Sequence, residues 1–126
     1  MQTILVIDDE LGATEVLVAA LEDEGYRVLS ASNGQHGLDS LAATPVDLVI
    51  SDFMMPLMDG AELGRAMKAD PALAAIPIIM MSALSEPLTR ANFADYAAFL
   101  RKPFRAAALV ELVRKVLPPE KTPPPA

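Results

Sequence analysis

The sequence predicts an α/β protein with a doubly wound parallel sheet. Short apolar runs alternate with segments in which apolar residues recur at helical spacing. The runs are apolar at nearly every position, which is typical of strands covered on both faces. Acidic residues directly follow two of these runs, as expected where an open α/β sheet binds a ligand at the carboxyl ends of its strands.

The first elements are clear from their patterns. Thr3–Ile7 is a continuously apolar strand, and Ala13–Glu24 has apolar residues on one helical face. Gly25 ends this helix, and Arg27–Ala31 is a second strand. These elements together predict the first strand–helix–strand unit of the sheet.

The middle of the chain repeats this order. Asn33-Gly34 marks a turn that leads into a helix ending near Ala43, and Leu48–Ser51 is the third strand. A third helix runs from Gly60 to about Ala69. Asp70-Pro71 then breaks it.

The last elements vary in clarity. Ile78–Met81 is a fourth strand, Leu88–Ala94 is a weak helical stretch, and Tyr96–Leu100 is a fifth strand despite its alanines. Arg105–Leu117 is the clearest helix, because its leucines and valines recur three and four residues apart.

Composition limits the possible functions. The length suits one domain, predicted over residues 1–117, followed by a proline-rich tail or linker at residues 118–126. The absence of cysteine excludes a thiolate metal site, and a net charge of −7 disfavours direct nucleic-acid binding. No apolar run is long enough to span a bilayer, so a cytoplasmic protein without membrane contact is expected.

Chemically useful side chains follow the predicted strands. Right-handed crossovers place every strand-to-helix loop at one edge of a parallel sheet. That edge would gather three carboxylates, a hydroxyl and an ammonium group: Asp8, Asp9, Asp52, Ser82 and Lys102. Carboxylate oxygens suit Mg²⁺, and a lysine suits a phosphoryl group. Taken alone, Asp8-Asp9 also fits a helix N-cap.

Several motifs in this order resemble the receiver domain of two-component response regulators, from about Gln2 to Leu117. The motifs are Ile7-Asp8-Asp9-Glu10, Asp52 with Met55-Pro56 and Asp59-Gly60, Ser82-Ala83, and Lys102-Pro103-Phe104. The resemblance implies a flavodoxin-like sheet of five strands in the order 2-1-3-4-5 with five flanking helices. It also implies a signalling switch whose catalysis is limited to its own phosphorylation and dephosphorylation.

The resemblance assigns roles to the residues at the sheet edge. It implies that Asp52 accepts a phosphoryl group from a histidine kinase or a histidine phosphotransfer protein. Mg²⁺, or Mn²⁺ in its place, would be bound by Asp9, Asp52 and the backbone carbonyl of Met54, and by Asp8 through water. Ser82 and Lys102 would contact the phosphoryl oxygens.

Other roles follow from the same resemblance. Phe99 occupies the position of an aromatic residue that follows the switch motion. The kinase is expected to dock beside the first helix, and an output domain or effector protein is a possible further partner. The expected docking residues are Leu11, Gly12, Thr14 and Val16.

The chain also departs from the family pattern. The segment from Ser82 to Lys102 is about two residues shorter than usual, so the fourth helix is predicted to be short, displaced or mobile. The positions that flank the phosphoryl group hold Met54 and Leu84, which cannot orient an attacking water. Slow self-dephosphorylation is therefore predicted.

Two other functions stay open from the sequence. A small phosphohydrolase resembling the haloacid dehalogenase class would use Asp8 and Glu10 with Ser82 and Lys102, but it leaves the residues around Asp52 unexplained. A degenerate receiver that serves only as a scaffold is the other alternative, and the full acidic set argues against it.

Overall fold

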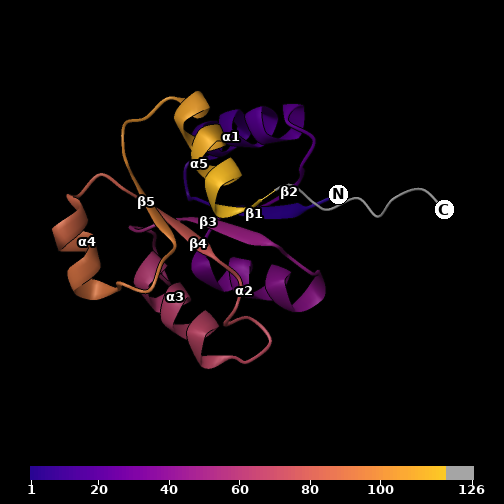
Figure 1. The fold of residues 1–126 in the computed structure, drawn as a ribbon. Coiled ribbons are helices and arrows are strands. Elements are labelled where there is room, and N and C mark those ends of the chain that lie inside the picture. Colours follow the sequence, from indigo (N-terminus) through magenta and orange to yellow (C-terminus); the bar gives the residue numbers. More distant parts are fainter. Residues whose placement is uncertain (119–126) are drawn as a thin grey trace.

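A computed structural model describes residues 1–118 of the chain. A parallel sheet of five strands, in the order β2-β1-β3-β4-β5, forms its centre, and helices cover both faces (Figure 1). The predicted fold class and strand order are therefore confirmed. The predicted tail lies outside the described residues, except for Pro118.

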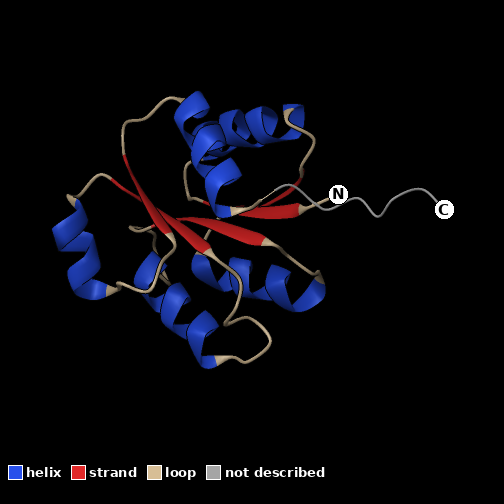
Figure 2. Cartoon of the chain, in the orientation of Figure 1, coloured by secondary structure: helices blue, strands red, loops and turns tan. Residues whose placement is uncertain are grey.

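Strands and helices alternate along the whole described chain (Figure 2). In order, the elements are β1 (Thr3–Ile7), α1 (Leu11–Asp23), β2 (Arg27–Ala31), α2 (Gly34–Ala43), β3 (Leu48–Asp52), α3 (Gly60–Ala69), β4 (Ile78–Ser82), α4 (Glu86–Asn92), β5 (Ala98–Arg101) and α5 (Ala106–Val116). Within residues 1–118, no helix is both long and apolar enough to cross a membrane.

The hydrophobic core consists of two layers, one on each face of the sheet. Every residue of β1, β3 and β4 is buried, because these three strands form the centre of the sheet. Along β1, Ile4 and Val6 contribute to one core cluster, whereas Leu5 and Ile7 contribute to the other. α1 and α5 cover the first of these faces, and α2 and α3 cover the second (Figure 1).

The boundaries of three elements differ from the prediction by two residues, and those of several others by one. α1 begins at Leu11, two residues before the predicted start at Ala13. The apolar pattern missed this turn because Leu11 and Gly12 face solvent. α4 runs from Glu86, because Pro87 is tolerated in the first turn of a helix, where its missing N–H has no intrahelical partner.

The fifth strand is also displaced from its predicted position. β5 covers Ala98–Arg101 and pairs Ala98 with Ile79 of β4, whereas Tyr96 precedes the strand. Alanines at this edge strand carry little β propensity, so local composition did not define its ends. The prediction of a short fourth helix agrees with the 7 residues of α4.

Candidate functional site

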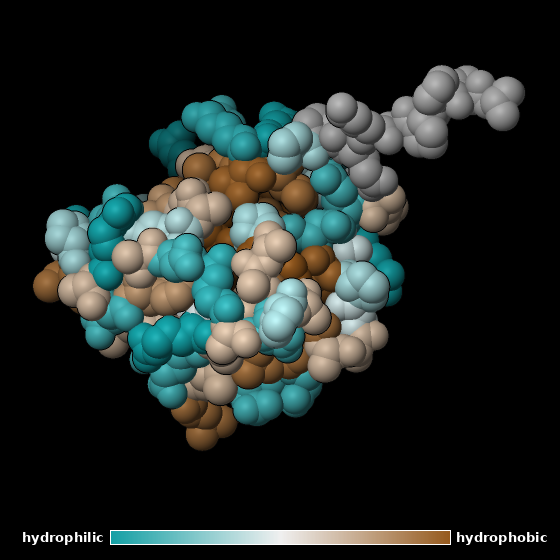
Figure 3. Space-filling view, turned by 60° about the horizontal axis from the view of Figure 1, so that its bottom comes forward, coloured by the Kyte–Doolittle hydropathy of each residue, from teal (hydrophilic) through white to brown (hydrophobic). Residues whose placement is uncertain are grey.

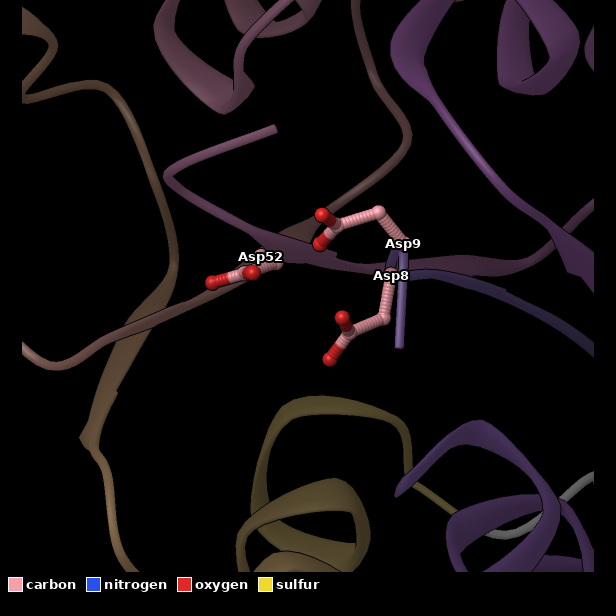
Figure 4. A group of neighbouring side chains, drawn as sticks. All are labelled: Asp8, Asp9 and Asp52. Carbon is pink, nitrogen blue, oxygen red and sulfur yellow. The ribbon is translucent and has the colours of Figure 1, made fainter. Parts of the chain in front are cut away.

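Two neighbouring strands carry the three carboxylates. Asp8 and Asp9 directly follow β1, and Asp52 is the last residue of β3. Because β1 and β3 pair in parallel with Ile7 opposite Ser51, Asp8 and Asp52 leave the sheet side by side. Each of the three acids offers a carboxylate oxygen, and these oxygens all lie within 4.8 Å of one another. Figure 4 shows the three side chains extending into a common space, with the Asp9 carboxylate directed toward Asp52.

Lys102 joins this cluster from the loop after β5. Its Nζ atom lies 3.1 Å from Asp8 Oδ2 and 3.3 Å from Asp52 Oδ2. Its backbone N–H donates to the carbonyl oxygen of Ser82 at 2.8 Å, which extends the pairing of β5 with β4 by one residue. The ammonium group is therefore held between the two buried carboxylates, at the distance of a direct ion pair.

Burial changes the acidity of these groups. Asp8 is 1% and Asp52 is 6% exposed, whereas Asp9 is open to solvent. Burial raises the pKa of Asp52 to about 6; Lys102 opposes this rise, and the charges of Asp8 and Asp9 add to it. Burial alone would lower the pKa of Lys102, but the charge of Asp52 and the hydrogen bond to Asp8 outweigh it, so that pKa is raised.

The donor set fits a hard divalent cation. The three carboxylates carry three negative charges when ionised and Lys102 carries one positive charge, so two negative charges remain uncompensated. Asp8 Oδ1 accepts the Glu10 N–H at 3.0 Å, which fixes the orientation of this carboxylate. All candidate ligands are oxygen atoms, as Mg²⁺ requires. The cluster therefore has both the charge and the chemistry to bind Mg²⁺.

A glycine allows α3 to start directly beside Asp52. A Cβ atom on Gly60 would lie 2.6 Å from the Asp52 carbonyl oxygen and 2.8 Å from the sulfur of Met80. Asp59 caps α3 by accepting the Glu62 N–H at 2.8 Å, within a complete capping box. Asp59 thus caps the helix, and Gly60 allows the helix to pack closely against the backbone of Asp52.

Ser82 and Phe99 lie near the cluster without joining it. Ser82 is fully buried, and its hydroxyl oxygen accepts the Leu84 N–H at 3.0 Å. Phe99 packs against the core on the α2–α3 face, with its ring centroid 6.1 Å from that of Tyr96. The predicted switch residues therefore lie on neighbouring strands, with Phe99 opposite Met80 and Ser82 opposite Arg101, and the Ser82 hydroxyl oxygen accepts from its own loop.

Two apolar residues follow Asp52 and Ser82 closely in the chain and line a shared groove. Met54 is 60% exposed, and both Met54 and Leu84 line a groove of about 450 Å³ between the loop after β3 and the region of α4. Its other lining residues are Phe53, Met55, Pro56, Asp59 and Asn92. The groove thus has a thioether and an aliphatic chain at the positions two residues after Asp52 and Ser82.

The expected docking residues on α1 differ in exposure. Leu11 is 72% and Val16 is 60% exposed, and Gly12 also faces solvent. Thr14 is only 6% exposed, and its hydroxyl donates to the Glu10 carbonyl oxygen at 3.0 Å. The Thr14 side chain is therefore unavailable to a partner, because it is buried and its hydroxyl bonds back to the carbonyl one turn earlier in the helix.

Comparison with known proteins identifies the family. The model of the response regulator receiver domain matches residues 4–114. The chain belongs to this family. The receiver domain matches 118 residues of the phosphate regulon transcriptional regulatory protein PhoB of Pseudomonas aeruginosa at 36% identity, covering 92% of this chain and 52% of that protein. This receiver domain thus spans about half the length of the curated relatives it matches.

Solved receiver structures have the same architecture. The chemotaxis protein CheY4 of Vibrio cholerae superposes with a TM-score of 0.88 at 28% identity, covering 93% of this chain and 99% of that one. The response regulator TrrA of Thermotoga maritima, solved in complex with Mg²⁺ and BeF, gives 0.83 at 32% identity, covering 93% and 100%.

Sequence reasoning assigned no role to Tyr96 or Glu86, which are hydrogen-bonded in the structure. Glu86 lies before the predicted start of the fourth helix and Tyr96 inside the predicted fifth strand, so the pattern gave no reason to pair them. One signal was present in the sequence: Glu86 and Arg90 are four residues apart, a spacing at which opposite charges on a helix often form an ion pair.

Proposed function

We propose that this receiver domain is a Mg²⁺-dependent phosphoacceptor switch in which Asp52 takes a phosphoryl group from a phosphohistidine. The observation that carries the proposal is the position of Asp52. It is a buried carboxylate 3.3 Å from Lys102, within 4.8 Å of two further carboxylates, at the carboxyl edge of the sheet. Family membership supports the same role.

The transfer is a displacement at phosphorus. A carboxylate oxygen of Asp52 attacks, the new O–P bond forms, and the P–N bond to the histidine ring breaks with its electron pair going to nitrogen. Bound Mg²⁺, or Mn²⁺, would neutralise charge on the transferring phosphoryl group. Asp9 and Asp52 would bind the ion directly, Asp8 through water, and the Met54 carbonyl would add a third direct protein oxygen.

The other groups position and stabilise the product. Lys102 lies between Asp8 and Asp52, so its ammonium group is placed to offset the charge of an acyl phosphate on Asp52. Asp8 keeps Lys102 in place through the 3.1 Å contact. Ser82 would donate its hydroxyl proton to the phosphoryl group, and turning the side chain toward Asp52 would break or carry along its contact with the Leu84 N–H.

The phosphoryl donor reaches Asp52 along α1. A groove of about 320 Å³ extends from Asp8 and Lys102 to Val16, Leu17 and Phe104. Leu11 and Val16 are exposed on the same helix. We assign this apolar groove to a histidine kinase or a histidine phosphotransfer protein, because its polar end opens at the acid cluster. Thr14, which is buried, is left out of this surface.

The output of the switch is a proposal drawn from the relatives. The matched curated proteins are about twice as long as this chain, and their names describe transcriptional regulators. The receiver domain would therefore act on an attached output domain or a separate effector protein. Its own net charge of −7 disfavours direct contact with nucleic acid.

Phosphoramidate tests this proposal because its P–N bond resembles that of phosphohistidine. The wild-type domain should take up phosphate from this donor with Mg²⁺, and uptake should stop when EDTA is added. Asp52→Asn should abolish uptake, whereas Asp95→Asn, which changes an exposed acid, should leave it intact. Undiminished uptake by Asp52→Asn would overturn the proposal.

A further inference from the structure

The two ends of α4 are held by different kinds of contact. At the C-terminal end, the Asn92 carbonyl oxygen accepts a hydrogen bond from Arg65 Nη1 of α3 at 2.9 Å. The ring of Phe93 packs so closely on Gly64 that a Cβ atom there would lie 2.6 Å from it. This end is therefore fixed to α3 by close packing.

The N-terminal end of α4 is held by a polar cluster. The Tyr96 hydroxyl donates to Glu86 Oε2 at 2.8 Å, and Arg90 Nη2 donates to the same oxygen at 3.0 Å. Arg90 Cζ also lies 5.5 Å from the centre of the Tyr96 ring, which in turn packs on Phe99. We call Glu86, Arg90 and Tyr96 the Tyr96 clamp. It connects α4 to the segment that enters β5, at one side of the sheet (Figure 1).

The clamp is directly connected to Ser82. Ser82 ends β4, three residues form a loop, and Glu86 is the first residue of α4. The Ser82 hydroxyl oxygen accepts the Leu84 N–H within this loop, which fixes the orientation of the side chain. If the hydroxyl turns to donate its proton to a phosphoryl group on Asp52, either this hydrogen bond breaks or the loop moves with the side chain. Movement of so short a loop displaces Glu86, because Glu86 follows it directly in the chain.

We propose that the Tyr96 clamp holds the Ser82 loop in its unphosphorylated position, so that Tyr96 and Glu86 are positioning residues for the phosphoryl contact. This inference rests on the proposed function. Phe99 has no hydroxyl group, so the Tyr96 hydroxyl supplies the polar link between the β5 side and α4. Because Glu86 follows the Ser82 loop directly and accepts the Tyr96 hydroxyl, movement of this loop would strain the Tyr96–Glu86 hydrogen bond, and the clamp would oppose activation.

The clamp is suited to this role because it is weak enough to open. Glu86 and Arg90 have side chains that are 43% and 57% exposed, and ion pairs at such positions contribute little to folding. Only Thr89 is buried in α4 among its described residues. The N-terminal end of α4 can therefore move while the Phe93–Gly64 contact keeps the other end in place.

Tyr96→Phe removes the hydroxyl and keeps the ring that packs on Phe99 and Arg90. The probe is beryllofluoride with saturating Mg²⁺, and the measurement is its dissociation constant, followed through the backbone amide signal of Leu84. Tyr96→Phe should bind the probe roughly three- to tenfold more tightly, because one hydrogen bond to a half-exposed carboxylate no longer opposes the loop. Tyr26→Phe is the matched control and should leave the dissociation constant unchanged. Glu86→Gln should give a smaller gain, since the amide oxygen still accepts the Tyr96 hydrogen bond.

A double-mutant cycle with Ser82→Ala separates positioning from a structural effect. If the clamp acts through Ser82, Tyr96→Phe should no longer tighten binding in the Ser82→Ala background. A dissociation constant for Tyr96→Phe equal to that of the wild type would overturn the inference. So would an equal gain with and without the Ser82 hydroxyl. Failure of the wild-type domain to bind beryllofluoride with Mg²⁺ would overturn the proposed function and this inference together, which distinguishes the two failures.

Discussion

Ser82 connects two regions that are stabilised in different ways. Its strand β4 pairs with β3, which ends at Asp52, and the loop after it leads to α4. Asp8 and Asp52 extend from central strands in which every residue is buried. α4 has one buried residue, and exposed polar groups tie its first turn to Tyr96. The acids are thus held by the core, whereas the first turn of α4 is held by polar contacts that water can replace.

This difference separates chemistry from response. The acids that bind a cation or attack a phosphoryl group must keep their positions. Asp8 and Asp52 do so because the strands from which they extend are buried. A segment that changes position must be among the less stable parts of the fold. α4 is such a part because it has few buried residues. Figure 3 shows one face of the molecule as a mixture of hydrophilic and hydrophobic patches, so no single apolar surface dominates that view.

The largest expected effect comes from removing the ammonium group of Lys102 from the acid cluster. Lys102→Met should slow phosphate uptake from phosphoramidate by about 10- to 100-fold, because a hydrogen bond to a charged group contributes about 1.5–3 kcal/mol. The rate of uptake at saturating Mg²⁺ is the measurement. Arg101→Met, which changes the exposed residue just before Lys102, serves as control. Wild-type uptake by Lys102→Met would remove Lys102 from the site.

The stability of the metal-free domain should depend on pH through Asp52. Burial raises the pKa of Asp52 from 3.8 to about 6, so folding favours the protonated acid. Stability from this group is therefore full below the unfolded pKa and is lost as pH rises toward 6. With EDTA at about pH 7.5, Asp52→Asn should raise the free energy of unfolding by about 2 kcal/mol, and at about pH 3.5 the difference should vanish.

Urea unfolding at the two pH values measures this effect. Asp39→Asn, an exposed acid on α2, is the control and should change stability little at either pH. Added Mg²⁺ should stabilise the wild-type domain more than Asp52→Asn, because the ion binds a ligand that the variant lacks. Equal stability of Asp52→Asn and the wild type at the higher pH would contradict the assigned electrostatics.

The smallest expected effect concerns Met54 and Leu84, the apolar residues two positions after Asp52 and Ser82. Met54→Asn or Leu84→Glu should speed loss of phosphate after donor removal by about three- to tenfold, because a polar group there can orient water. The decay rate of loaded protein is the measurement. Leu57→Asn is a suitable control, since Leu57 lies in the same loop, is 86% exposed and has a positive φ that asparagine tolerates. Unchanged decay in both variants would show that the apolar pair does not shield the phosphoryl group.

The sequence predicts the central strands and the acid cluster well, because the patterns that indicate them lie within short segments of the chain. Strands buried on both faces appear as continuous apolar runs, and topology then places Asp8, Asp52 and Lys102 at one edge. It does not predict that Lys102 contacts both acids, because that geometry depends on where the loop after β5 places the ammonium group. It also expects Thr14 at the surface, since helical spacing does not reveal that its hydroxyl bonds to Glu10.

The region of α4 and β5 was predicted less accurately than the acid cluster. Glu86 and Tyr96 are separated by 10 positions, and neither has a pattern that points to the other. The limits of α4 and β5 depend on tertiary contacts such as Phe93 on Gly64, which override weak local propensities. The groups that we propose as the responsive part of the switch are therefore those that sequence patterns missed.

The central claim is that Asp52 carries the phosphoryl group, and mapping the modified residue tests it most directly. The wild-type domain would be loaded from phosphoramidate with Mg²⁺ and treated with borohydride, which reduces an acyl phosphate to an alcohol. Peptide mass spectrometry would then locate the altered side chain. We predict homoserine at position 52 and none at position 8. Modification of Asp8 instead would favour the phosphohydrolase alternative, and either that result or an unmodified Asp52 would contradict the proposed switch.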